Sequence, residues 1–92
     1  MPLMRGRILG YDADRMIFEF TMMQEARIVD CEISSVALDD LAGEKGLRPN
    51  EREAQFQRLR DTIERIASGM FDESGMSPGE TIRIFSKHVR NR

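Results

Sequence analysis

Apolar and polar residues alternate along 16–23 and again along 26–33, which is the spacing of a β-strand with one buried face. The apolar positions that share this face are Met16, Phe18, Phe20 and Met22 in the first stretch and Val29, Cys31 and Ile33 in the second. Residues 7–11, Arg-Ile-Leu-Gly-Tyr, read as a first short strand before the aspartate-rich turn at 12–15. The pattern therefore predicts a three-stranded antiparallel meander that buries one face.

The two alternating stretches also predict a pairing. If Gln24 and Glu25 form a two-residue hairpin loop, Phe20 faces Val29, Phe18 faces Cys31 and Met16 faces Ile33. All six side chains then lie on one face, and a slip of one residue would destroy that agreement. The same register, extended through the first turn, places Tyr11 opposite Met16 and Leu9 opposite Phe18 on the core face.

Two helices are expected after the meander. Ser34 is a plausible N-cap for a short helix over 35–42, which Gly43 ends. Asn50 is expected to cap a second helix, with Glu53 in the third position of a capping box. The apolar stripe of this helix has spacings of three and four: Phe56, Leu59, Ile63, Ile66 and Met70. We expect it to end between Gly69 and Phe71.

Turn-forming residues dominate 72–79, residues 81–85 (Thr-Ile-Arg-Ile-Phe) read as a last strand, and residues 86–92 are mostly polar. The predicted fold class is α+β: a three-stranded antiparallel meander, a short helix, a long amphipathic helix, and a C-terminal strand joining the same sheet. We expect one domain over 1–92, with an ordered core at about 6–86 and a polar tail at 87–92.

Composition narrows the class of protein. The 92 residues suffice for one domain, and a net charge of −2 creates no field that favours nucleic acid or an acidic membrane. No apolar run approaches the roughly 20 residues of a membrane span, and the first residues lack the apolar segment of a signal peptide. The single cysteine suits a reducing compartment. A cytoplasmic protein without a membrane partner is expected.

Three stretches carry a family resemblance: Met-Ile-Phe-Glu-Phe at 16–20, Cys-Glu-Ile-Ser-Ser-Val-Ala-Leu at 31–38, and Phe-Gln-Arg-Leu-Arg-Asp-Thr-Ile-Glu-Arg-Ile-Ala at 56–67. Together they resemble the YrdB-like family of short bacterial proteins, a domain of unknown function. The resemblance spans roughly residues 8–86. It implies an α+β fold with a small antiparallel sheet packed by helices, and it supplies no catalytic residues.

Cys31 is the only thiol in the chain. A nucleophilic cysteine needs a nearby cation, a helix N-terminus or a histidine to lower its pKa. Its neighbours Asp30 and Glu32 oppose thiolate formation, and the register places Cys31 in the core against Phe18. We interpret it as a buried structural cysteine.

No metal site is expected. His88 is the only histidine and has no second ligand at metal spacing, so we interpret it as exposed in the polar tail. The acidic pairs Asp12/Asp14 and Asp39/Asp40 lack the glycine and the final glutamate of an EF-hand loop. Turn chemistry explains the first pair, and the exposed side of a short helix explains the second. No catalytic, cofactor-binding or metal-binding residue is predicted, and the protein is not expected to be an enzyme.

The strand face opposite the predicted core is the main candidate site. The register places Glu19 across from Asp30, and like charges in that position are destabilising. The candidate interaction patch consists of Ile8, Ile17, Glu19, Met23, Ile28, Asp30 and Glu32. Either this is a solvated face whose acids are neutralised by Arg83 or another arginine, or it contacts a basic partner or a second copy of the chain.

Both ends of the chain are basic, and the candidate basic patch consists of Arg5, Arg7, Lys87, Arg90 and Arg92. If the termini lie together, these residues could bind phosphate, but the aromatic residues that could stack on bases are assigned to the core. The preferred hypothesis is a non-enzymatic interaction or self-association module, with a protein partner or a homo-oligomer. The alternatives are a small nucleic-acid-binding protein that uses the terminal arginines, and an unrecognised enzyme or metal site around the acids.

Overall fold

The structure, a computed structural model, describes residues 3–74 and 79–90. Its elements are β1 (Met4–Asp12), β2 (Ile17–Gln24), β3 (Arg27–Ser34), α1 (Ser35–Ala42), a 3-10 helix η1 (Pro49–Glu51), α2 (Arg52–Ser74), β4 (Ile82–Ile84) and α3 (Ser86–Arg90). The strand order is β1-β2-β3-β4, with antiparallel pairing in the meander. The α+β class is confirmed, and β4 joins the same sheet.

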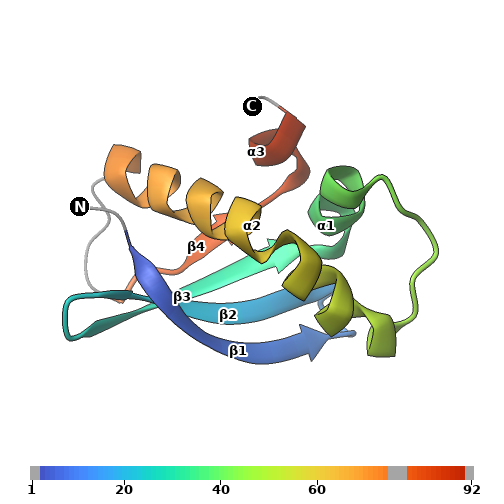
Figure 1. The fold of residues 1–92 in the computed structure, drawn as a ribbon, viewed down its shortest axis with the longest axis horizontal. Coiled ribbons are helices and arrows are strands. Elements are labelled where there is room, and N and C mark those ends of the chain that lie inside the picture. The colour runs from blue at the N-terminus through green and yellow to red at the C-terminus, as the bar shows by residue number, and fades with distance from the viewer. Residues whose placement is uncertain (1–2, 75–78, 91–92) are drawn as a thin grey trace.

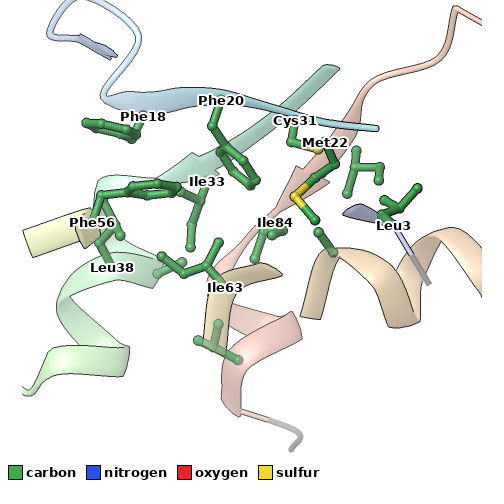
Figure 2. Close-up of a cluster of buried hydrophobic side chains, with 14 of the residues drawn as sticks. Leu3, Phe18, Phe20, Met22, Cys31, Ile33, Leu38, Phe56, Ile63 and Ile84 are labelled. Carbon is green, nitrogen blue, oxygen red and sulfur yellow. The ribbon is translucent and has the colours of Figure 1, made fainter. Parts of the chain in front are cut away.

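The last strand pairs with β3 in parallel, so the sheet is mixed rather than antiparallel throughout. Parallel neighbours require a crossover connection, and here α1 and α2 provide it. The helices lie on one side of the sheet, with α2 running across it (Figure 1). Between the layers, the Phe56 ring packs against Phe18 and Phe20, with ring centroids 4.5 and 4.9 Å apart (Figure 2).

The hairpin register differs from the prediction by two residues. Gln24 pairs with Arg27, so the loop is Glu25-Ala26, and Glu25 adopts a positive φ of 56°. The facing pairs on the core side are Phe18–Ile33, Phe20–Cys31 and Met22–Val29. A shift of two residues leaves every side chain on its predicted face because the strand period is two. Met16, which was expected in the core, lies exposed in the preceding turn.

Strand β1 is irregular. Its pairing with β2 shifts between Arg5 and Ile8 and again between Ile8 and Gly10. As a result Ile8 faces Phe20 and packs against the core, whereas Leu9 is exposed. The predictions for both residues were wrong, because strict alternation cannot continue through a bulge.

The helix boundaries were predicted in part. Helix α1 has the expected bounds: the Ala37 amide donates to Ser34 Oγ, and Gly43 ends the helix with φ 68°. The Asn50 cap was wrong, since Asn50 lies inside η1, and it is the Arg48 amide that donates to Glu51 Oε1 at the start of that helix. Helix α2 also continues to Ser74, beyond its predicted end. Its stripe faces the core as expected: Phe56 and Ile63 are fully buried, and Leu59, Ile66 and Met70 pack against the cluster.

The polar tail was wrong for residues 87–90, which belong to α3 (Ser86–Arg90) with Val89 buried in the core. The Phe85 amide donates to His88 Nδ1 at 2.8 Å, and His88, in the middle of this helix, is half-buried. Part of the predicted turn, residues 75–78, and Arg92 lie outside the described residues.

Candidate functional site

The face of the sheet that points away from the helices, here called the outer face, holds most of the candidate interaction patch. No helix of the described residues covers it (Figure 1). Met4 pairs with Met23, and Met23 pairs with Ile28, so three apolar side chains form a row across β1, β2 and β3. Met4 is 67% exposed and Ile28 is 64% exposed. We call this set the apolar row.

A charged cluster of Arg15, Glu19, Glu32 and Arg83 lies farther along the same face. Glu19 is directly opposite Glu32, not Asp30, because of the changed hairpin register. Arg83 Nε lies 2.9 Å and Arg15 Nη2 lies 3.2 Å from Glu32 Oε1, and Arg15 Nη1 lies 3.9 Å from Glu19. The side chain of Glu32 is only 9% exposed. The expected neutralisation by Arg83 is therefore present, and it permits an almost buried carboxylate.

The turn before β2 positions Arg15. Asp12 Oδ1 accepts hydrogen bonds from the amides of Asp14 and Arg15, as the turn chemistry of this segment predicted. Around the charged cluster lies a hollow with a volume of about 340 Å³, also lined by Leu9, Asp30 and Thr81. The polar side chains of this hollow include both carboxylates and guanidinium groups, so it could contact either a cationic or an anionic group of a partner.

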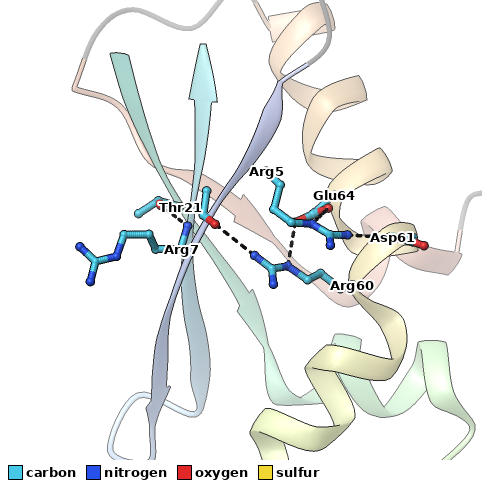
Figure 3. A network of polar contacts seen from close by, with 7 residues as sticks. Arg5, Arg7, Thr21, Arg60, Asp61 and Glu64 are labelled. Atoms are coloured by element: carbon cyan, nitrogen blue, oxygen red, sulfur yellow. Dashed lines mark hydrogen bonds and ion pairs between the residues drawn. The ribbon is translucent and has the colours of Figure 1, made fainter. Parts of the chain in front are cut away.

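Between the apolar row and the charged cluster lies the row of Arg7, Thr21 and Asp30. The Arg7 amide donates to Thr21 Oγ1 at 2.9 Å, and Thr21 pairs with Asp30 on β3. Figure 3 shows the Arg7 side chain on the opposite side of β1 from α2. Arg7 and Asp30 are both exposed, and neither forms an ion pair within the described residues.

Six of the seven predicted patch residues lie on the outer face: Ile17, Glu19, Met23, Ile28, Asp30 and Glu32. Ile17 is only 6% exposed, so its side chain is covered by its neighbours and offers almost no area for contact with a partner. Ile8 belongs to the core side instead. Met4 and Leu9 are exposed residues that the sequence analysis missed, because the bulges of β1 hide their alternation. A glycine inside a predicted strand was the available sequence signal of irregularity, and Gly10 adopts a φ of 132° in the structure.

The described members of the candidate basic patch are not gathered in one place. Arg5 donates to Glu64 and Asp61 of α2 (Figure 3), and Arg90 pairs with Asp40 of α1. Arg5 belongs to β1 and Arg90 to the helix that comes after β4, so the two arginines lie near opposite edges of the sheet. Lys87 is exposed on α3 beside Arg90.

A buried polar cluster that the sequence analysis did not identify joins α1 to α2. Arg52 donates to Asp39 at 2.6 Å and to Gln55 at 2.8 Å, and its guanidinium lies 5.5 Å from the Tyr11 ring centroid. Gln55 also donates to Asp39 at 2.9 Å. Burial raises the pKa of Asp39, but the hydrogen bonds from Arg52 and Gln55 and the charge of Arg52 lower it by more. Asp39 is thus part-buried and pairs with Arg52, whereas Asp40 is exposed, as expected, and pairs with Arg90.

Cys31 is buried as expected, although its partner is Phe20 rather than Phe18. Burial, followed by the charge of Asp30, raises the pKa of its thiol to about 12, which keeps it protonated and unreactive. Burial and the neighbouring Lys87 lower the pKa of His88. The buried Cys31 thiol therefore lacks the surroundings that activate a catalytic nucleophile.

Comparison with known proteins places this geometry in a family. The family model described as a protein of unknown function, DUF1488, matches residues 6–84. The chain belongs to the DUF1488 family. A crystal structure of a DUF1488 family protein of unknown function from Shewanella loihica PV-4 is similar, with a TM-score of 0.77 and 23% identity, over 89% of this chain and 90% of that chain. At that identity the likeness shows a shared fold. A search of curated proteins gave no match.

DUF1488 membership confirms the resemblance to a family of short proteins of unknown function, although neither comparison carries the YrdB name. Within residues 3–74 and 79–90, this DUF1488 protein has no helix with the length and apolar composition to cross a bilayer. The same residues contain no group of three or more His, Cys, Asp or Glu side chains placed to bind a metal ion. The outer face thus remains the candidate functional site of this DUF1488 chain.

Proposed function

We propose that this DUF1488 protein is a non-enzymatic interaction module that binds a protein through the outer face of its sheet. The observation that carries the proposal is the apolar row, in which Met4 and Ile28 are about two-thirds exposed on either side of Met23. Isolated exposed apolar residues are common, but adjacent ones on a face without a covering element are typical of contact surfaces. The ion pairs of the charged cluster provide a polar rim beside this row.

The face is a better candidate than the edge of the sheet. Strand β1 is an edge strand, so its free backbone groups could in principle pair with another strand. Its two register shifts twist that edge, and bulges of this kind are a common protection against strand pairing. The proposal is therefore contact between side chains on the outer face.

Photo-crosslinking in cells of the host organism tests this proposal for any partner. A photoreactive phenylalanine analogue replaces Ile28 on the outer face, and in a matched variant it replaces Val36, which is 50% exposed on α1. Illumination is expected to give a defined protein adduct from position 28 and none from position 36. Equal adduct formation from both positions, or none from position 28, would overturn the proposal.

Binding to nucleic acid has less support. Arg5 and Arg90 are already paired with carboxylates, at opposite edges of the sheet. We therefore expect no RNA binding at about 50 mM salt, where phosphate contacts are strong. Tight binding that weakens steeply with added salt would favour this function instead.

We propose that the protein interaction of the outer face takes place in a reducing bacterial cytoplasm, since Cys31 is a free thiol.

A further inference from the structure

The outer face carries two unpaired charges of opposite sign on the strands that flank β2. Arg7 on β1 and Asp30 on β3 both lie beside Thr21, so they occupy the same row. Both side chains are exposed, and neither has an ion-pair partner within the described residues. One strand lies between them, so each is displaced by about 5 Å to one side of β2.

We infer that the partner of the outer face is a second copy of this chain, related by a two-fold axis that runs approximately along β2. This inference rests on the proposed function. Rotation by 180° about such an axis, placed between two stacked faces, keeps each position along the strand and exchanges β1 with β3. Arg7 of each copy then lies over Asp30 of the other, which makes two identical ion pairs.

The same operation also matches the apolar row with itself. Met23 meets Met23 of the second copy, and Met4 meets Ile28 in both directions. Stacked sheets lie about 10 Å apart, a distance that facing arginine and aspartate side chains can span together. One contact is unfavourable, since the axis brings the two Glu19 side chains near each other. Each of them retains Arg15 at 3.9 Å, which reduces that repulsion.

The dimensions of the face predict a weak dimer. The axis places β1 over β3 and β2 over β2, and it leaves β4 outside the overlap. Three strands of up to nine residues, at the usual spacings, give a contact face of about 400 Å² on each copy, or about 800 Å² in total. That area is below the roughly 1,200–2,000 Å² of a stable specific interface, so we expect a transient dimer with a dissociation constant in the micromolar range or above. The protein should therefore be studied from low micromolar to near-millimolar concentration.

Charge reversal in the purified protein tests the axis. Arg7→Asp places two aspartates in each contact, and Asp30→Arg places two arginines there, so each variant alone should dimerise at least about tenfold more weakly. An equimolar mixture of the two variants restores both ion pairs in the mixed dimer. Sedimentation equilibrium should therefore show dimerisation in the mixture that neither variant shows alone. Arg27→Asp, at an exposed arginine at the hairpin end of β3, is the matched control and should dimerise like the wild type.

The outcomes separate this inference from the proposed function. If the wild type stays monomeric near millimolar concentration while position 28 forms an adduct with a different protein in cells, the second copy is overturned and the interaction module stands. If the wild type dimerises but the mixture gains nothing over its components, the axis along β2 is overturned. Circular dichroism of each variant establishes that it is folded before its sedimentation is compared.

Discussion

The close approach of β1 to β2 at Gly6 gives a sharp test of the structure. A Cβ atom at this position would lie 2.4 Å from Thr21 O and 2.5 Å from Thr21 Oγ1. The nearest of these atoms belongs to the backbone of β2, so a change of side-chain rotamer cannot relieve the clash. In Gly6→Ala, β1 must therefore move, which weakens the bonds from the Arg7 amide to Thr21 and from Arg60 to Gly6 O.

The expected loss of stability follows from these contacts. Overpacking typically costs about 1–3 kcal/mol, and a weakened hydrogen bond adds about 0.5–1.5 kcal/mol. The lower entropy of alanine in the unfolded chain offsets about 0.4–1 kcal/mol. Gly6→Ala should thus lower the free energy of unfolding by about 1–3 kcal/mol. For a domain of this size, that corresponds to a fall in Tm of roughly 5–20 °C.

Gly69→Ala is the matched control, because the same substitution should have the opposite sign. Gly69 lies inside α2, and a Cβ atom there would have no neighbour within 4 Å. Alanine is favoured over glycine in a helix by about 0.8–1 kcal/mol, so Tm should rise by a few degrees, roughly 3–8 °C. Thermal unfolding followed by circular dichroism measures both variants. A Gly6→Ala protein as stable as the wild type would refute the bulge and the resulting placement of Arg7 on the outer face.

Three further predictions concern polar groups. Glu32→Gln should lower the free energy of unfolding by about 1–3 kcal/mol, because two half-exposed arginines lose a nearly buried partner. Asp30→Asn, at an exposed position, should change the free energy of unfolding by less than about 0.5 kcal/mol. Urea titration compares the two variants, and equal effects would contradict this account. The folded pKa of Asp39 lies below its unfolded value of about 3.9, so its stabilising effect is present above that pH and is lost as pH falls through the lower folded pKa. Urea midpoints measured from neutral to acidic pH should therefore fall less for Asp39→Asn than for the wild type, and parallel curves would argue against the cluster. The Cys31 thiol should react with a disulfide reagent at about pH 8 only after unfolding, and rapid labelling of the folded protein would show that it is not buried.

The sequence pattern predicted correctly those elements that depend on residues close together in the chain, namely α1 and the buried faces of β2 and β3. Helix α1 has its expected bounds because Ser34 and Gly43 act on their own neighbours. The core faces of β2 and β3 were correct although the pairing was displaced by two residues, since a period of two is unchanged by that shift. The exact loop depended on Glu25 adopting a positive φ, which nothing in its residue type signals.

The remaining differences depend on contacts between distant residues. Helix α3 is mostly polar, and its place on the core depends on the burial of Val89 and on the pairing of Arg90 with Asp40 of α1. For the candidate site, alternation placed Glu19 and Ile28 on the outer face correctly. The exposure of Met4 and Leu9 depends on how β1 bulges against β2, which local spacing does not encode.

The parallel pairing of β4 has a consequence for biosynthesis. Arg83 meets Glu32 across 51 residues of chain, so the open side of β3 cannot be covered until α1, α2 and β4 have been made. At about 5–20 residues per second, a ribosome needs roughly 3–10 s for that segment. During this interval Cys31 and Ile33 belong to an unprotected strand edge, the kind that aggregates most readily. A nascent chain arrested before Ile82 would keep that edge permanently and should collect in the insoluble fraction.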